Sequence, residues 1–260
     1  MKIQYCSDLH LEFPENKALL KAGPLLPVGD ILVLAGDIVP FALMNKHNDF
    51  FDYVSDNFEF TYWIPGNHEY YHSDITQRSG TFNESIRSNV VLLNNQTVIH
   101  KKVRLVFSTL WSRIRPAYQF QIERGMSDFH VIKDHGHRFS ADRFNQLHSD
   151  CIGFIQPELE QAFDGKTIVV SHHMPTLMNY PPKFKGDVLN DAFAVEISEL
   201  IEVSKPAYWI FGHLHGDIHA FKIGETILLT NQLGYVKYDE HGAFRNDVCI
   251  NIDDNAETYE

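Results

Sequence analysis

The chain has 260 residues, 44% of them hydrophobic, and a formal net charge of −12. This composition supports a sizeable core, and no apolar run approaches the roughly 20 residues that a membrane-spanning helix needs. So acidic a chain repels phosphodiester backbones, which argues against a large nucleic-acid footprint. A small phosphorylated substrate is still compatible, because a bound metal ion reverses the local field.

The N-terminal residues and the cysteines bear on the cellular compartment of the protein. Met1–Cys6 lacks the basic start and long apolar middle of a signal peptide and is typical of a first core strand. Cys6, Cys151 and Cys249 are odd in number and form no Cys-x-x-Cys pair, which argues against a disulfide framework or a thiolate zinc site. We therefore expect a cytoplasmic protein with no membrane partner; the sequence predicts no oligomeric state.

Short apolar runs, each followed by polar residues, recur along the chain and are typical of strands buried on both faces. They are Lys2–Cys6, Ile31–Ala35, Phe60–Ile64, Val103–Phe107, Thr167–Val170, Ala207–Phe211 and Thr226–Leu229. The last of them forms a predicted hairpin with the apolar stretch before it, because Gly224-Glu225 separates the two.

Helical spacing separates several of these runs. It predicts helices over Phe41–Phe58, from an N-cap at Ser140 to Ile155, and over Asp191–Ile201. Strands that alternate with helices predict an α/β fold with largely parallel strand order early in the chain. No repeat or linker divides the sequence, so we expect a single domain over residues 1–260.

The stretch 112–149 breaks this alternation. It holds five of the nine arginines, and we expect a long irregular connection beside the site, a candidate lid. Arginines are usually solvated, but this concentration in an acidic chain favours phosphate contact by one of them. The five are Arg113, Arg115, Arg124, Arg138 and Arg143.

Polar clusters follow the predicted strands at their carboxyl ends, where ligands bind in open α/β sheets. Carboxylate, imidazole and amide groups without a thiolate are ligands of borderline and hard divalent metals. The clusters contain Asp8, His10, Asp37, Asn67, His68, His172, His173, His213 and His215.

The spacing of these residues predicts that they converge. Asp8-x-His10 and His213-x-His215 would each present two side chains on one side of an extended backbone, because the strand period is two. Asp8, Asp37 and Asn67 are about 30 residues apart, the length of one strand-helix repeat.

There are more ligands here than one metal ion needs. The set suits two ions about 3.5–4 Å apart with a shared carboxylate, which clamp a phosphoryl centre and lower the pKa of a bridging water. A histidine beside the ions would protonate the leaving alkoxide.

At these residues the chain resembles the calcineurin-like metallophosphoesterases, and in detail small bacterial phosphohydrolases of that family. The matching motifs stand in the family's order over residues 8 to 215: Asp8-Leu9-His10, Gly36-Asp37, Gly66-Asn67-His68-Glu69, Ser171-His172-His173 and Gly212-His213-Leu214-His215. The resemblance implies an α/β sandwich of two mixed β-sheets flanked by helices.

The resemblance also implies roles for individual residues. One metal ion would bind Asp8, His10 and His215, with Asp37 bridging to a second ion bound by Asn67, His172 and His213. The two ions would be Mn, Fe, Zn or Ni. His68 would be the catalytic general acid or would stabilise the phosphoryl oxygens, so that Asn67 and His68 both face the substrate.

Several residues near the predicted ligands can be interpreted in two ways. His173 is either a support for the ligands or a packing residue, and Glu69 orients the turn or, as the weaker alternative, takes part in catalysis. Tyr71 and Tyr235 belong to the core or line the site.

We therefore expect a metal-dependent phosphohydrolase that cleaves a small-molecule phosphoester, a phosphodiester rather than a monoester, by attack of a metal-bridging hydroxide. One alternative is a DNA nuclease of the same family, which salt-dependent DNA binding would reveal. The other is a non-catalytic scaffold with the same fold, which would bind no metal and show no turnover.

Overall fold

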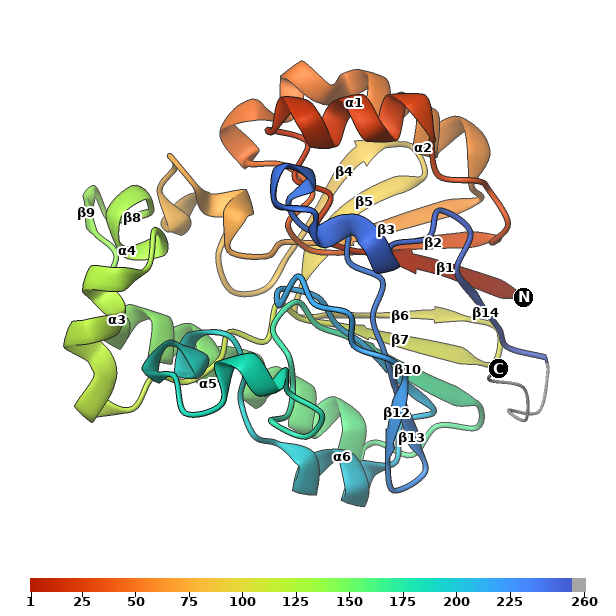
Figure 1. The fold of residues 1–260 in the computed structure, drawn as a ribbon. Helices are drawn as coiled ribbons and strands as arrows, with labels where there is room; N and C mark the ends of the chain where they lie inside the picture. Colours follow the sequence, from red (N-terminus) through yellow and green to blue (C-terminus); the bar gives the residue numbers. More distant parts are fainter. Residues whose placement is uncertain (254–260) are drawn as a thin grey trace.

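Two mixed β-sheets of six strands each face one another in a computed structural model, which describes residues 1–253 (Figure 1). The first sheet contains, in spatial order, β14 (Cys249–Asn251), β1 (Lys2–Cys6), β2 (Ile31–Ala35), β3 (Phe60–Ile64), β5 (Val90–Asn94) and β4 (Phe82–Arg87). The second contains β12 (Phe221–Ile223), β13 (Thr226–Leu229), β11 (Tyr208–Ile210), β10 (Lys166–Val170), β7 (Val103–Phe107) and β6 (Gln96–His100). The predicted sandwich is confirmed.

Parallel strands form the centre of each sheet and antiparallel strands form the edges. β1, β2, β3 and β5 run parallel, and so do β7, β10, β11 and β13. β14, β4, β12 and β6 are antiparallel to their neighbours. Every residue of β2 and β7 is buried, as the continuous apolar runs predicted.

Helices cover the outer faces of the sandwich (Figure 1). The first sheet is covered by α1 (Pro14–Ala22) and α2 (Asn48–Asn57), and the second by α5 (Ala141–Glu160) and α6 (Ser198–Ser204). Three apolar clusters result, one between the sheets and one under each helical layer. Each large side chain buried in them contributes about 1.5–3 kcal/mol.

The remaining elements are short. They are α3 (Gln119–Gly125), α4 (Asp128–Val131), β8 (Lys133–Asp134), β9 (His137–Arg138) and the 3-10 helices η1 (Phe41–His47), η2 (His68–Tyr70), η3 (Ile75–Arg78), η4 (Pro116–Tyr118), η5 (Pro182–Phe184), η6 (Val188–Ala192), η7 (Val236–Tyr238) and η8 (Glu240–Ala243). The stretch 112–149 therefore contains short helices and one small hairpin, and its last residues already belong to α5.

The helix predictions are right in part. Ser140 caps α5 by accepting a hydrogen bond from the Arg143 amide, and the predicted helix over 41–58 is present as η1 followed by α2. The predicted helix over Asp191–Ile201 is wrong: η6 ends at Ala192 and α6 begins only at Ser198. Between them, Ala194 bridges to Met174, so pairing with a neighbouring segment overrides the helical spacing.

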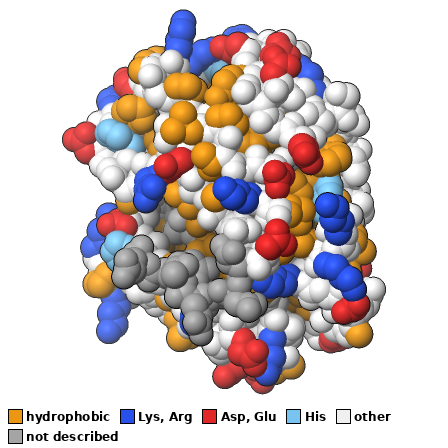
Figure 2. Space-filling model, turned by 90° about the vertical axis from the view of Figure 1, so that its right-hand side faces the viewer, with side chains coloured by type: hydrophobic (Ala, Val, Ile, Leu, Met, Phe, Trp, Pro, Cys, Tyr) orange, Lys and Arg blue, Asp and Glu red, His pale blue; other side chains and the backbone are white. Residues whose placement is uncertain are grey.

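All seven predicted strands are present, with β10 one residue longer and β11 two residues shorter than their apolar runs, and the Gly224 hairpin is confirmed. Strands β4, β5, β6 and β14 were not predicted. At the end of the molecule where the N-terminus lies, basic and acidic side chains are interspersed (Figure 2). Among residues 1–253, no helix combines the length and the apolar character that crossing a bilayer requires.

Candidate metal centre

The predicted site residues follow the carboxyl ends of five parallel strands. Asp8 and His10 follow β1, Asp37 follows β2, and Asn67 follows β3 in the first sheet. In the second sheet, His172 follows β10, and His213 and His215 follow β11. Parallel order within each sheet brings these ends together, so the structure places all seven predicted ligands at one end of the sandwich.

The backbone at these positions is not extended, which corrects the predicted reason for the convergence. The φ angles are +57° at Asp8, +46° at His10, +56° at Asp37, +80° at His213 and +45° at His215. Left-handed backbone costs a residue with a side chain roughly 1–2 kcal/mol and persists where the surrounding structure enforces it. Tight turns beyond the strand ends, and not strand alternation, aim the side chains inward.

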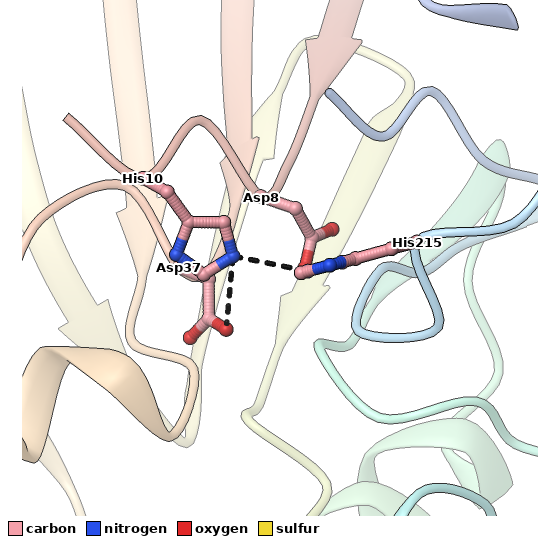
Figure 3. Close-up of side chains that lie close together, drawn as sticks. All are labelled: Asp8, His10, Asp37 and His215. Atoms are coloured by element: carbon pink, nitrogen blue, oxygen red, sulfur yellow. Dashed lines mark hydrogen bonds and ion pairs between the residues drawn. The ribbon is translucent and has the colours of Figure 1, made fainter. Parts of the chain in front are cut away.

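Four side chains from three segments of the chain, Asp8, His10, Asp37 and His215, form the first cluster (Figure 3). His10 Nε2 lies 3.0 Å from His215 Nε2 and 3.8 Å from Asp37 Oδ2, and His215 Nε2 lies 3.2 Å from Asp8 Oδ1. One potential ligand atom from each of the four lies within 4.8 Å of the others, so one cation could contact all four.

The second cluster shares Asp37 with the first and adds His172 and His213. His172 Nε2 lies 3.4 Å from Asp37 Oδ1 and 3.2 Å from His213 Nδ1. Asn67 Oδ1 is 3.3 Å from the same His172 nitrogen. Asp37 is therefore placed to bridge two adjacent cation positions.

The hydrogen bonds of the histidines fit metal binding. The Nδ1–H groups of His10, His172 and His215 donate to Glu12 Oε1, the Ala35 carbonyl and Glu240 Oε2, respectively. An acceptor on Nδ1 fixes the tautomer and leaves Nε2 as a lone pair facing the cluster. Lone pairs on His10 Nε2 and His215 Nε2, which are 3.0 Å apart, repel each other unless a proton or a metal ion lies between them.

The charges in the two clusters also favour metal binding. Burial alone would lower the pKa of His172, but Asp37 outweighs it and raises that pKa to about 9. Burial is likewise outweighed at His215, where hydrogen bonds to Asp8 and Glu240 raise the pKa to about 10. The buried carboxylates thus create a negative potential that favours cations, and divalent ions are the stronger competitors where four ligands converge.

Two glycines make room for these side chains. A Cβ atom on Gly66 would lie 2.2 Å from Asp37 Oδ1 and 2.6 Å from His172 Nε2, and one on Gly212 would lie 2.7 Å from Asp8 Oδ2. Any larger residue at either position would displace a predicted ligand.

Glu69 organises the turn after β3 from a fully buried position. Its carboxylate accepts hydrogen bonds from the Asp37 and Ile38 amides, the Gly66 amide and the Trp63 indole. Burial and the nearby Asp37 raise the pKa of Glu69 to about 8. These contacts tie the turn holding Asn67 to the turn holding Asp37, in agreement with the orienting interpretation.

His68 belongs to neither of these two clusters; with His10 and Glu12 it forms a third group of closely spaced potential ligand atoms. Its Nδ1 is 3.1 Å from Glu12 Oε1, its Nε2 is 3.1 Å from the Tyr235 hydroxyl, and its ring stacks on Tyr71. Burial lowers the pKa of His68, but Asp37 and Glu12 outweigh it and leave that pKa raised. A proton held at His68 is thus stabilised next to the predicted reaction centre.

Sequence reasoning missed Glu12, which contacts both His10 and His68 through one oxygen. Burial raises the pKa of Glu12, yet hydrogen bonds from the two histidines lower it to about 2. The available signal was the continuation of the first motif, Asp8-x-His10-x-Glu12.

Asp128 was also missed, because it lies in the irregular stretch 112–149 with no motif around it. Its Oδ1 accepts hydrogen bonds from Asn67 Nδ2 at 2.9 Å and from the Tyr71 hydroxyl at 2.7 Å. Since Nδ2 is held by Asp128, the Asn67 Oδ1 atom is the one turned toward His172. Asp128 therefore fixes the orientation of the Asn67 amide.

Other residues near the motifs have structural roles. His173 is buried against Trp111 and Phe144, and its ring also lies 4.3 Å from the ring of the predicted ligand His213, so these contacts fit both interpretations of this residue. The five arginines of 113–143 are absent from the lining of the cavity at the clusters, and Arg115 pairs with Asp191 instead.

A cavity of about 320 Å³ opens onto the clusters. Asp37, Asn67, His68, His213 and His215 form its base, and aromatic and acidic side chains surround them. The surrounding side chains include Tyr71, Asp128, Phe184, Phe193, Tyr235 and Glu240. Met126, Ser127 and Asp128 from the stretch 112–149 form part of the wall.

Comparison with known proteins agrees with this geometry. The family model of the calcineurin-like phosphoesterases matches residues 1–217. An uncharacterized protein, L509, of Acanthamoeba polyphaga mimivirus is 30% identical and covers 96% of both chains.

One solved structure shares the fold. The phosphopantetheinyl hydrolase of Mycobacterium tuberculosis superposes with a TM-score of 0.72 at 14% identity, over 100% of this chain and 98% of that chain. A dimetal phosphatase from Danio rerio gives a TM-score of 0.48 at 12% identity, over 89% of this chain and 87% of that one. Two divalent metal ions are the cofactor of the matched family, and the two clusters are able to hold them. The chain belongs to the calcineurin-like phosphoesterase family and is a metal-dependent phosphoester hydrolase.

Proposed function

We propose that the protein hydrolyses a phosphodiester bond in a small molecule. One ion would be held by Asp8, His10, Asp37 and His215, and the other by Asp37, Asn67, His172 and His213. Two divalent ions bound there supply positive charge for the phosphoryl oxygens and lower the pKa of a water molecule.

The residues of the chain supply the remaining steps. Asn67 and His68 lie at the base of the cavity and would contact the phosphoryl oxygens of the substrate. Glu12 holds Nδ1 of His68 and leaves Nε2 facing the Tyr235 hydroxyl at the cavity wall. From this position His68 would donate its proton to the ester oxygen that leaves.

The charge of the cavity wall is the observation that favours a diester. Among the described residues that line the cavity there is no Lys or Arg, whereas Asp128 and Glu240 are acidic. A monoester dianion carries one more charge than a diester monoanion, and this wall offers no side chain to neutralise it. The volume of about 320 Å³ suits a small molecule.

A substrate comparison tests the proposal. With Mn²⁺ bound, kcat/KM for bis(4-nitrophenyl) phosphate is expected to exceed that for 4-nitrophenyl phosphate by about fivefold or more, since one unpaired charge near the wall costs at least about 1 kcal/mol. Both substrates release the same chromophore, so one absorbance assay measures both. A preference for the monoester would contradict the diester proposal.

The charge of the molecule argues against a nuclease. The net charge is −12, and the face that Figure 2 shows has no continuous basic stripe.

We also propose a reducing, cytoplasmic environment, which the free thiols of Cys6, Cys151 and Cys249 support.

The stretch 112–149 contributes to the proposed site. We propose that it acts as a lid within a single domain, because Asp128 in this stretch both lines the cavity and holds the Asn67 amide.

A further inference from the structure

A second cavity, of about 470 Å³, adjoins the one at the metal clusters. Tyr235 is common to them, since it lines both cavities. On the catalytic side, its hydroxyl pairs with His68, and its ring lies 4.7 Å from the His10 ring. On the other side, its ring makes an edge contact with Phe13 at 5.4 Å. The second cavity is therefore separated from the proposed proton donor, His68, by one residue, Tyr235.

Aromatic rings line the second cavity without being covered by the protein. Phe13 is 37% exposed and Tyr238 is 67% exposed. Other large apolar residues of the chain are exposed too, so exposure alone is no sign of a site. What distinguishes Phe13 and Tyr238 is that they flank Tyr235, at centroid distances of 5.4 and 6.1 Å.

The walls of this cavity are held in place before any ligand binds. Buried Asn16, in α1, donates to the carbonyls of Leu9 and Gly234 and accepts from the Val236 amide. These bonds join the segment that carries Phe13 to the segment that carries Tyr238. In Figure 1 the two segments lie next to each other. Preorganised walls lower the entropic cost of binding a ring between them.

The charges that line the cavity balance. Lys237 lies near the Tyr238 ring, and Glu15 is the acidic residue among the lining side chains. With one charge of each sign, the cavity offers no net attraction to an anion. Its selectivity therefore rests on the flat apolar faces of the rings, which favour a planar aromatic group.

We propose that this second cavity is the leaving-group subsite and that it binds an uncharged aromatic group, an aryl ring or the base of a nucleoside. The inference rests on the proposed function. In the reaction, the oxygen of water bonds to phosphorus as the bond from phosphorus to the leaving oxygen breaks. The leaving oxygen takes its proton from His68, one proton of the water is released to solvent, and the other restores His68. The released aromatic alcohol then lies beyond Tyr235.

Two diesters that retain the same methyl group test the subsite. They are 4-nitrophenyl methyl phosphate and methyl 2,2,2-trifluoroethyl phosphate, followed by absorbance and by fluorine NMR with Mn²⁺ present. Tyr238→Ala is expected to raise KM about tenfold for the aryl ester with kcat kept, because stacking on one ring contributes roughly 1–3 kcal/mol. KM for the trifluoroethyl ester should stay the same.

Phe120→Ala is the matched control. Phe120 is 69% exposed and has the Arg124 guanidinium over its ring, much as Lys237 lies near Tyr238, yet it lines neither cavity. The Phe120→Ala substitution should leave KM unchanged for the aryl ester and for the trifluoroethyl ester. Equal effects of Tyr238→Ala on both esters, or no effect on either, would overturn the subsite.

A binding experiment separates the subsite from the reaction. Ligand-observed NMR with adenosine should show binding to the wild type and a loss of about tenfold in affinity with Tyr238→Ala. If the wild type hydrolyses neither diester, the proposed function fails, and adenosine binding alone decides the subsite. No adenosine binding to the wild type would overturn it.

Discussion

Replacing Asp37 with alanine is expected to abolish diester hydrolysis and to weaken the binding of both metal ions. Asp37 belongs to both clusters. One of its carboxylate oxygens lies near His172 and the other near His10. Several kcal/mol of transition-state stabilisation depend on the ions, so kcat/KM for bis(4-nitrophenyl) phosphate should fall by about 10³-fold or more.

A second variant of the metal centre and a control variant accompany Asp37→Ala. Asn67→Ala should also abolish hydrolysis, but it should weaken only the ion near His172, because Asn67 contacts that cluster alone. Asp49→Ala removes an exposed carboxylate of α2 and should change neither activity nor metal binding. Full activity of Asp37→Ala and Asn67→Ala with Mn²⁺ present would show that the clusters are not the reaction centre.

Replacing His68 with alanine is expected to produce a loss of activity that depends on the leaving group. If His68 donates the proton, kcat should fall by about 10²–10⁴-fold for an alkyl leaving group, which departs poorly as an alkoxide. With 4-nitrophenolate, which departs readily without a proton, the loss should be much smaller. Trifluoroethyl and 4-nitrophenyl methyl phosphates measure the two cases.

Glu12→Gln serves as a second variant for the same question. Glutamine keeps the shape of the side chain but removes the negative charge that Nδ1 of His68 faces. The alkyl ester should again lose more activity than the aryl ester, though less than with His68→Ala. Glu202→Gln, at an exposed position of α6 that lines neither cavity, is the control. Equal losses for both esters in His68→Ala would assign His68 to phosphoryl binding and not to proton transfer.

The family resemblance implied the sandwich, whereas the apolar runs predicted the parallel α/β order and the positions of the predicted ligands for a physical reason. Residues 31–35 are wholly apolar, and residues 103–107 are apolar apart from Arg104, because both faces of these strands are buried; the ends of the strands were therefore easily located. Ligand-bearing turns directly follow such strands. Parallel order then forces Asp8, Asp37 and Asn67 to one edge of the sheet.

Edge elements were harder to predict. β4 alternates intermediate and exposed residues and β6 has no buried residue, so neither reads as an apolar run. The backbone of the turns was not predictable from strand period, since Asp8 and His10 both take left-handed angles.

The residues that support the ligands could be found only in three dimensions. Asp128 reaches Asn67 across 61 positions of sequence, and Glu240 reaches His215 across 25. Neither lies in a motif, because a hydrogen-bond acceptor beside a ligand can come from any segment that packs there. Glu12 is the exception, since it directly continues the motif of the first cluster.

The number of metal ions bound per chain tests the central claim most directly. Equilibrium dialysis against Mn²⁺, with bound metal measured by elemental analysis, should give two ions per chain for the wild type and weaker binding of both for Asp37→Ala. One ion or none in the wild type, or two ions held unchanged by Asp37→Ala, would contradict a two-ion centre bridged by Asp37.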